Sequence, residues 1–587
     1  MAAYAPPVAD MTYLIDEIFA AEAAWAALPA FSGVDAALAR QILEEAGKFC
    51  AEVARPLNAS GDAEGCRLEN GAVTTPKGFP EAYAAFVAAG WPGLSASPDH
   101  GGQGLPRSLQ ILVDEMLSAA NLSFGLFGGL TRGAAEALER HGSDALKAAY
   151  LPKLVEGVWT GAMDLTEAQA GSDLGLLKTR AEPQPDGSYK ITGSKIFISS
   201  GDHDLAENVV HLVLARAPDA PAGVKGLSLF LAPKFLPKPD GSLGARNAVH
   251  VGALERKMGI HAQPTCVMNY DGATGWLVGE PNRGLAAMFT MMNAERLFVG
   301  VQGLGLADAS YQTASLYARE RLQGRGPDGA GPSPIIAHPD VRKMLLEMAA
   351  FVEAGRALAL WTALEMDRET ADPDPAAREA AGELVALMTP VVKAAFTDFG
   401  FRATTLGQQV LGGHGYIREW GQEQFVRDAR IAQIYEGTNG IQAADLVGRK
   451  LPQAGGRPIR RFVALVEASC ASAEAQPGAE GFVRDLREAL AILAKPTARF
   501  SAGASPAETG AAATDYLRLL ALVAFGWMWL RMAAHALAQG EAASPHARRK
   551  LALARFYFAR MLPEALGLGR MIEAGAPSIV ALDAEAF

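Results

Sequence analysis

The segment LTEAQAGSD, residues 165–173, stands at the point where the character of the sequence changes. Residues 11–158, which precede it, are rich in alanine and leucine at helical spacing. Behind it, short β-favouring runs such as residues 209–214 alternate with Gly, Pro and Asp-Gly turns. The segment also offers the hydroxyls of Thr166 and Ser172 to a ligand, although an ordinary Asx turn explains the same pattern. We therefore expect a helical part of the chain to give way here to a sheet.

This change and a later return to helical spacing predict four domains. They are a helical domain over residues 1–160, a β domain over 161–285, a helical bundle over 286–451 and an additional helical domain over 452–587. The stretch GRGPDGAGPSP, residues 324–334, is so rich in Gly and Pro that we expect a loop inside the third domain.

Composition and charge restrict the class of protein. Half of the 587 residues are hydrophobic and a fifth are charged, which is typical of a soluble globular protein. The formal net charge of -11 offers no broad positive field for a phosphate backbone, so nucleic acid is not expected as a main partner.

The cysteines and the N-terminus indicate the compartment. The four cysteines lie far apart and form no CxxC pair, so we expect neither a disulfide framework nor a metal site. The N-terminal sequence MAAYAPPVADMTYLIDE lacks a basic start followed by an apolar run, which favours a cytoplasmic protein. The most apolar window, residues 519–530, is shorter than the ~20 residues that cross a bilayer. We expect a buried helix there and no membrane span.

Two longer patterns resemble those of the acyl-CoA dehydrogenase family. The first is met by Thr166, Glu167, Ala170, Gly171, Ser172 and Asp173, and the second by Gln409, Gly412, Gly413, Gly415 and Tyr416. The resemblance covers roughly residues 40–450. It implies an α+β fold with a helical N-terminal domain, a central β-barrel-like domain and a C-terminal four-helix bundle. The extra C-terminal helical domain resembles that of a bacterial subgroup with long-chain-type and 3-methylthiopropionyl-CoA dehydrogenases.

FAD is the cofactor that the resemblance implies. Thr166 is then expected near flavin N5 and O4, with Phe197 against the isoalloxazine ring and Ser199 in place of a usual Thr. Arg321 and Gln323 correspond to residues that reach the pyrophosphate of the neighbouring subunit, which implies a homo-oligomer, with a dimer favoured. The full set of implied cofactor contacts is Met163, Leu165, Thr166, Phe197, Ser199, Arg321, Gln323, Gly412, Gly413 and Thr438.

The catalytic base is expected in QIYEGTNG, residues 433–440. A glutamate beside a glycine is ordinarily a solvated turn residue. Tyr435-Glu436-Gly437-Thr438, however, matches the segment that carries the family's base, directly behind the second pattern. An apolar pocket would raise the basicity of Glu436 enough to take the proton α to a thioester.

A second carboxylate, Glu295, lies next to Arg296, which matches an arginine near the base in this family. Isovaleryl and long-chain branches supply the base from the position of Glu295, but they usually lack the glutamate of the Tyr-Glu-Gly segment. Glu436 and Arg296 are therefore the expected catalytic residues. The expected substrate contacts are Ser172, Glu295, Tyr435 and Gly437.

The resulting hypothesis is FAD-dependent α,β-dehydrogenation of an acyl-CoA thioester to the trans-2-enoyl-CoA. Electron-transfer flavoprotein is the implied electron acceptor, and β-oxidation of fatty acids is the implied setting. A 3-methylthiopropionyl-CoA dehydrogenase of the same mechanism and a flavin oxidase on the same fold remain alternatives. A third is a DNA-damage-response flavoprotein, for which the extension offers basic residues: Arg457, Arg460, Arg461, Arg548, Arg549 and Lys550.

Overall fold

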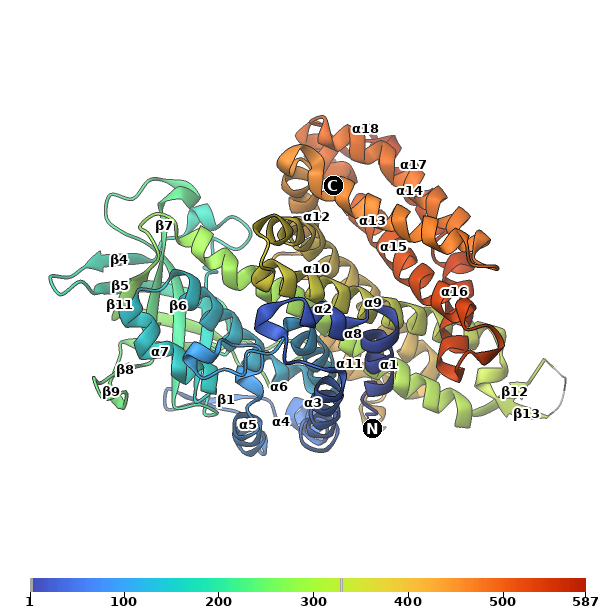
Figure 1. Cartoon of the computed structure of the whole chain (residues 1–587). Helices are drawn as coiled ribbons and strands as arrows, with labels where there is room; N and C mark the ends of the chain where they lie inside the picture. Colours follow the sequence, from blue (N-terminus) through green and yellow to red (C-terminus); the bar gives the residue numbers. More distant parts are fainter. Residues whose placement is uncertain (1–3, 328, 330) are drawn as a thin grey trace. The chain divides into compact units, whose positions relative to one another are not determined.

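The computed structural model describes residues 4–327, 329 and 331–587. The chain forms two compact units (Figure 1). Unit 1 comprises Met1–Gly47, Pro106–Ala119 and Val299–Phe587, and unit 2 comprises Lys48–Leu105 and Ala120–Phe298. Two long helices, α6 (Arg107–His141) and α8 (Gly284–Glu320), each contain a boundary between the units. In α6 the helical backbone is interrupted at Asn121, directly behind that boundary.

A closed sheet forms the centre of unit 2. Its strands are β3 (Trp159–Asp164), β4 (Arg180–Pro183), β5 (Tyr189–Ser199), β6 (Asn208–Arg216), β7 (Leu227–Pro233), β10 (Val249–Leu254) and β11 (Thr265–Val278). The order is β10-β11-β5-β4-β6-β3, and β7 pairs with both β11 and β6, which closes a ring. β3 and β4 run parallel to β6, and the other pairs are antiparallel.

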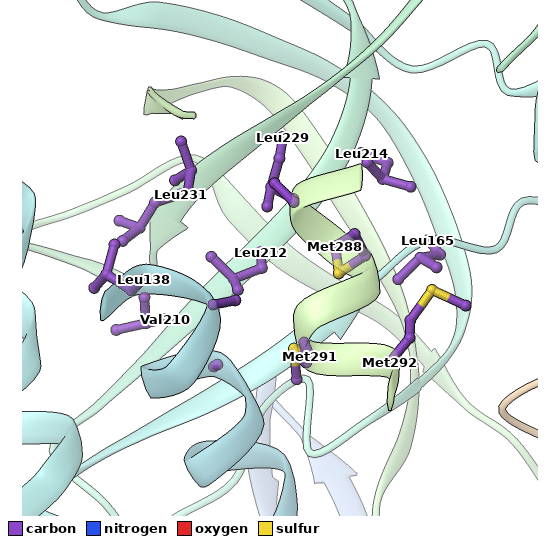
Figure 2. Close-up of a cluster of buried hydrophobic side chains, with 14 of the residues drawn as sticks. Leu138, Leu165, Val210, Leu212, Leu214, Leu229, Leu231, Met288, Met291 and Met292 are labelled. Atoms are coloured by element: carbon purple, nitrogen blue, oxygen red, sulfur yellow. The ribbon is translucent and has the colours of Figure 1, made fainter. Parts of the chain in front are cut away.

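Alternation along β6 and β7 gives each face of the sheet its own core. Val210, Leu212 and Leu214 of β6 point to one face with Leu229 and Leu231 of β7 (Figure 2). There they pack with Leu138 of α6 and with Met288 and Met291 of α8. The intervening residues, among them Val209, Val213 and Phe230, belong to a second cluster on the other face. The period of two follows from the pleat of a strand.

The first part of unit 2 carries helices α4 (Pro56–Glu64), α5 (Phe79–Ala88) and α7 (Asp144–Glu156). It also contains a hairpin of β1 (Arg67–Glu69) and β2 (Ala72–Thr74) that helical spacing did not predict. Asn70 and Gly71 form its turn with φ of 51° and 76°, which is the backbone that an Asn-Gly pair adopts in tight hairpins.

Unit 1 is helical. Its helices, besides parts of α6 and α8, include α1 (Val8–Tyr13), α2 (Ala21–Ala26), α9 (Pro339–Ala371), α10 (Pro375–Leu411), α11 (Gln422–Ala432) and α12 (Asn439–Asp445). Behind them come α13 (Arg457–Glu474), α14 (Glu480–Ser501), α15 (Pro506–Ala538), α16 (Pro545–Arg560), α17 (Glu564–Ala574) and α18 (Pro577–Val580). α8 and α10 approach closely because Gly303 faces Gly400. A Cβ added to Gly400 would lie 2.4 Å from the Gly303 carbonyl oxygen.

Helix α15 contains the most apolar window and is fully buried from Leu519 to Leu530, as predicted. It is longer than that window, however. Among the described residues, three helical stretches could cross a membrane by length and composition: Arg107–His141, Pro375–Tyr416 and Pro506–Ala538. Inside the structure 94%, 78% and 83% of their apolar windows are buried. In α15, Trp529 donates its indole N–H to the Ala350 carbonyl of α9 at 3.2 Å.

The loop expected at residues 324–334 is only partly a loop, because both of its ends belong to the strands of a short hairpin. Residues 328 and 330 lie outside the described residues. β12 (Leu322–Arg325) pairs with β13 (Pro332–Pro334). Proline is tolerated in β13 because this two-stranded ribbon leaves one side of each strand unpaired.

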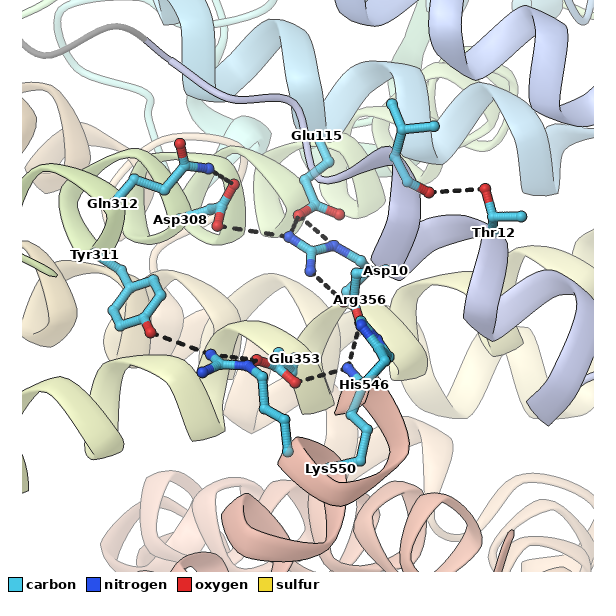
Figure 3. A network of polar contacts seen from close by, with 12 residues as sticks. Asp10, Thr12, Glu115, Asp308, Tyr311, Gln312, Glu353, Arg356, His546 and Lys550 are labelled. Atoms are coloured by element: carbon cyan, nitrogen blue, oxygen red, sulfur yellow. Dashed lines mark hydrogen bonds and ion pairs between the residues drawn. The ribbon is translucent and has the colours of Figure 1, made fainter. Parts of the chain in front are cut away.

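A buried cluster of charges joins distant parts of unit 1 (Figure 3). The guanidinium of Arg356 in α9 lies 2.5 Å from the carboxylates of both Asp10 and Glu115. Lys550 of α16 pairs with Asp10 and, at 2.7 Å, with Glu353 of α9. Burial raises the pKa of Glu115 to about 7 against the effect of Arg356. Burial also acts on Asp10, but Lys550 and the other partners outweigh it and hold the pKa of Asp10 well below its usual value.

Candidate active site

A β-bulge in β5 exposes the aromatic residue that the sequence places against a flavin. Lys195 pairs with Met268 of β11, but Ile198 pairs with Cys266, so β5 has one residue more than its partner. Lys195 and Ile198 are both buried, whereas Phe197 between them has φ of 61° and is 59% exposed. A left-handed backbone is an outlier for a bulky residue, and bulges re-aim side chains near functional sites. Without the bulge, Phe197 would lie on the same buried face of β5 as Lys195, because side chains two residues apart on a strand share a face.

The segment that follows β3 is held by hydrogen bonds from β5. The Thr166 carbonyl accepts from the Ile196 N–H at 2.9 Å, and the Leu165 carbonyl accepts from Lys195 Nζ at 2.9 Å. The Thr166 hydroxyl has no hydrogen-bond partner among the described residues, so it is available to a ligand. The Leu165 side chain lies in the core cluster of Figure 2, and a contact from this residue to a cofactor therefore has to come from its backbone.

Glu167 anchors the same segment. Its carboxylate accepts from Lys195 Nζ at 2.9 Å, from the Thr179 hydroxyl at 2.6 Å and from the Lys178 N–H at 2.7 Å. Burial alone would raise the pKa of Glu167, but the Lys195 ammonium and these hydrogen bonds outweigh it and lower the pKa to about 2. Glu167 is therefore ionised at neutral pH. Neither Glu167 nor Lys195 was predicted from the sequence to have a role in the site.

Three further predicted residues of unit 2 differ in exposure. Met163 is half-buried in β3, and Ser199 is half-buried at the end of β5. Ser172 is exposed in a turn in which the Asp173 carboxylate accepts from the Gly175 N–H at 2.9 Å. This is the Asx turn of the alternative interpretation, and it leaves the Ser172 side chain in solvent.

Glu436 lies in the connection between α11 and α12 with a left-handed backbone, φ 58°, and a half-buried side chain. Thr438 begins α12 as its N-cap, accepting from the Ile441 N–H at 3.4 Å. The Tyr435 hydroxyl donates to Gln302 of α8. Capping and the side-chain bond fix the connection on both sides of Glu436.

A buried lysine also holds this connection. Lys393 of α10 donates to the Gly437 carbonyl at 2.8 Å and to the Asn439 side-chain oxygen at 2.9 Å. Gln442 donates to the Glu436 carbonyl at 3.1 Å. Lys393 was not predicted, although a lysine inside the apolar run VVKAAF is a usable signal because a lysine is rarely buried without a partner.

The second carboxylate is more deeply placed. Glu295 of α8 is 3% exposed and packs on α6, where a Cβ added to Gly133 would lie 3.0 Å from its Oε1. Arg296 is buried as well, with its guanidinium 5.6 Å from the ring centre of Phe289 and a 3.3 Å hydrogen bond to Asn293. Glu295 and Arg296 belong to unit 2, and Glu436 belongs to unit 1.

The second sequence pattern forms an exposed turn in unit 1. Gly412 has φ of 57°, and no atom lies within 4 Å of a Cβ added to Gly412 or Gly413. Tyr416 is 85% exposed, and His414 stacks on Trp420 with ring centres 4.4 Å apart. These glycines leave room for another molecule to approach the backbone.

Arg321, directly before β12, and Gln323, within it, are both exposed. Each unit thus offers groups of a kind that FAD binds: Arg321 and Gln323 are donors in unit 1, and unit 2 presents the exposed ring of Phe197 and the hydroxyl of Thr166. A planar ring system can lie on an exposed aromatic face, and an arginine can pair with a pyrophosphate. The residues present therefore fit FAD.

The basic residues of the extension are engaged within unit 1. Arg457 and Arg461 face Glu383, at 2.5 and 3.7 Å, and Arg549 faces Glu353 at 2.7 Å. Arg460 and Arg548 donate to backbone carbonyls, at 2.6 and 2.5 Å. The three ion pairs offset part of the positive charge that a DNA-binding surface would need, and the two hydrogen bonds hold the other guanidinium groups against the protein.

Comparison with known proteins matches four family models to successive parts of the chain. They are "Acyl-CoA dehydrogenase, N-terminal domain" over residues 37–158, "Acyl-CoA dehydrogenase, middle domain" over 162–273, "Acyl-CoA dehydrogenase, C-terminal domain" over 282–451 and "Acetyl-CoA dehydrogenase C-terminal like" over 462–583.

Among similar proteins, 3-methylmercaptopropionyl-CoA dehydrogenase of Ruegeria pomeroyi is 46% identical over 534 residues, covering 89% of this chain and 90% of that protein. The broad-specificity linear acyl-CoA dehydrogenase FadE5 of Mycobacterium tuberculosis is 34% identical over 592 residues, 95% of each chain. A crystal structure of acyl-CoA dehydrogenase from Bacillus anthracis complexed with FAD has the same fold. Its TM-score is 0.74 at 20% identity, over 97% of this chain and 91% of that one.

Proposed function

The chain belongs to the acyl-CoA dehydrogenase family, and on this premise we propose which of its residues carry out the reaction and which substrate it takes. It is an FAD-dependent acyl-CoA dehydrogenase. The predicted family, fold class, cofactor and reaction class are confirmed, including the extra helical C-terminal domain.

Glu436 is the base in this proposal, and its place in a fixed, half-buried connection is the observation that carries it. Its carboxylate takes the proton from the carbon α to the thioester carbonyl. Lys393 and Gln442 hold the Gly437 and Glu436 carbonyls, so the backbone beside the base is fixed when the proton moves. When bound, FAD supplies the acceptor for the hydride that leaves the β-carbon.

Residues of unit 2 hold the isoalloxazine end of the cofactor in this proposal, whereas Arg321 belongs to unit 1. Phe197 presents its exposed ring to the isoalloxazine, and Thr166 and Ser199 offer hydroxyls to its polar edge. Arg321 pairs with a pyrophosphate. Glu295 and Arg296 are buried, and we assign them to the wall of the acyl pocket rather than to proton transfer.

The test compares two isosteric variants. Glu436→Gln keeps the shape of the base but cannot accept a proton, so anaerobic reduction of bound flavin by acyl-CoA should slow ~100- to 10,000-fold with FAD still bound. Glu295→Gln should slow flavin reduction much less. If Glu295→Gln abolishes reduction while Glu436→Gln remains fast, the base is Glu295 and this assignment is wrong.

For the substrate we propose a short thioether acyl chain, 3-methylthiopropionyl-CoA. The proposal is supported by the relative that is 46% identical, against 34% for the linear acyl-CoA dehydrogenase. A panel of 3-methylthiopropionyl-CoA and straight-chain acyl-CoA thioesters, assayed with an artificial electron acceptor, should give the highest kcat/KM for the thioether. A clear preference for a straight chain would contradict it.

Three further properties complete the proposal. Electron-transfer flavoprotein takes the electrons, the enzyme works in the cytoplasm, and it forms a homodimer through the face that carries Tyr416. The exposure of Tyr416, Ile417 and Trp420 supports the last point, because adjacent exposed apolar residues mark interfaces. Sedimentation should give twice the mass of the chain, and a monomer at micromolar concentration would contradict the dimer.

The oxidase alternative has its own test. Rapid reoxidation of the reduced enzyme by air would favour it.

A further inference from the structure

We propose that Lys195 is a positioning residue that sets the flavin-binding surface by joining its two segments, and the proposal rests on FAD binding at Thr166 and Phe197. The first segment is residues 164–167, behind β3, and the second is the bulge of β5 at residues 196–197. Lys195 lies directly before the bulge with a fully buried side chain.

The ammonium of Lys195 reaches both neighbours of Thr166. It donates to the Leu165 carbonyl and to the Glu167 carboxylate, each at 2.9 Å. The next residue of β5, Ile196, donates its N–H to the Thr166 carbonyl at 2.9 Å. Two successive residues of β5 therefore hold three successive residues of the other segment, and Phe197 follows at once.

The start of the first segment is locked as well. Asp164 is fully buried, and its carboxylate accepts from the Tyr270 hydroxyl at 2.6 Å and contacts His211 Nδ1 at 3.1 Å. Residues 164, 165, 166 and 167 are thus all held through a carbonyl or a carboxylate. The Thr166 hydroxyl stays available to a ligand. Its position relative to the ring of Phe197 depends on the hydrogen bonds that Lys195 makes to Leu165 and Glu167.

A buried ion pair is a costly way to join two segments. Burial lowers the pKa of Lys195, and the Glu167 carboxylate opposes that shift. A buried pair often adds little net stability over an apolar pair of the same size, but it demands one geometry. That geometry is what a surface for a planar ring requires, so we assign the pair to placement of Thr166 and Phe197.

The experiment uses the full-length protein. Lys195→Met removes the donor to Leu165, and Lys190→Met is the matched control because Lys190 lies on the same strand but is exposed, with its ammonium donating to Thr274 at 3.0 Å. Titration of apoprotein with FAD should show a dissociation constant raised about tenfold or more in Lys195→Met, as for one lost charge-assisted hydrogen bond. Lys190→Met should stay within about twofold of the parent.

The midpoint potential of the bound flavin separates positioning from mere destabilisation. Lower stability alone reduces the melting temperature but not the potential of the molecules that remain folded. A displaced surface binds oxidised and reduced flavin unequally, and a tenfold inequality shifts a two-electron potential by about 30 mV. We expect a shift in Lys195→Met and none in Lys190→Met.

A double variant keeps the test decisive if Lys195→Met does not fold. Glu167→Gln combined with Lys195→Met leaves no unpaired charge, keeps one oxygen that can accept from Thr179, and still lacks the donor to Leu165. Parent-like FAD affinity and potential in whichever variant folds would overturn the proposal. A parent protein that fails to bind FAD would instead contradict the cofactor assignment on which it rests.

Discussion

The change Lys550→Met tests whether the C-terminal helical part is fastened to the N-terminal helix. Lys550 of α16 has a fully buried side chain between Asp10 of α1 and Glu353 of α9. The carboxylates of these acids are themselves only 11% and 8% exposed. Methionine keeps most of the apolar stem of lysine but leaves both carboxylates with one cation fewer.

The loss of stability expected in Lys550→Met follows from the burial of the ion pair. Removing one partner of a buried ion pair leaves an uncompensated charge and costs about 3 to 5 kcal/mol. At neutral pH the population of molecules with an opened α16 should then rise about 100- to 5,000-fold. Native-state proteolysis measures this population directly when opening and closing are fast compared with cleavage.

The matched control is Lys495→Met. Lys495 also pairs with a glutamate of the same region, Glu573, but their side chains are 74% and 52% exposed. Solvent screens such a pair, so its loss should leave the cleavage rate unchanged. Equal cleavage rates for the Lys550→Met and Lys495→Met proteins would refute the reasoning.

The pH dependence gives a second check on Lys550→Met. In the parent, Lys550 and other partners lower the pKa of Asp10, so the stabilisation is complete above the ordinary value of 3.8 and is lost only below it. Without Lys550 one cause of this lowering is gone, so the pKa of Asp10 is higher in the variant than in the parent, and protonation of Asp10 in acid costs the variant less stability. The difference in urea midpoint between parent and variant should therefore narrow as the pH falls below the ordinary value of 3.8.

Three further changes test the site and the extension. Lys393→Met removes two hydrogen bonds that hold the connection around Glu436, so flavin reduction should slow about 10- to 100-fold at unchanged FAD content, and an unchanged single-turnover rate would contradict this. Arg321→Ala should lower the flavin-to-protein ratio after gel filtration, since its charge is expected to meet the pyrophosphate; full retention would show that the assignment is wrong. Deleting residues 452–587 should expose the apolar faces that α15 covers and cause aggregation, whereas a soluble and active truncation would mark this part as an independent appendage.

Local patterns predicted the site's chemistry and the kind of each domain. The Tyr-Glu-Gly-Thr segment pointed to Glu436, and the β-favouring run in residues 209–214 predicted a strand where β6 lies. The Asn70-Gly71 pair carried a hairpin signal of the same local kind, which the helical spacing around it concealed.

Other features depend on pairing between distant residues and could not be predicted. The exposure of Phe197 follows from one extra residue in β5 relative to β11, and register is not visible in a single strand. From the sequence alone, Lys195 would be predicted to be a surface residue on an alternating strand. Its burial follows from its contacts with Leu165 and Glu167. The burial of Lys550 depends on a carboxylate near the other end of the chain.

That separation between Asp10 and α16 also sets an order of events during synthesis. His546 and Asp10, which share a 2.8 Å contact, are 536 residues apart, and a ribosome adding about 5 to 20 residues per second needs roughly 30 to 100 s between them. Unit 2 is complete once Phe298 has emerged, so it can fold while the rest is still being made. The pairing of Asp10 is therefore completed in two steps, first with Arg356 of α9 and only later with Lys550 and His546 of α16.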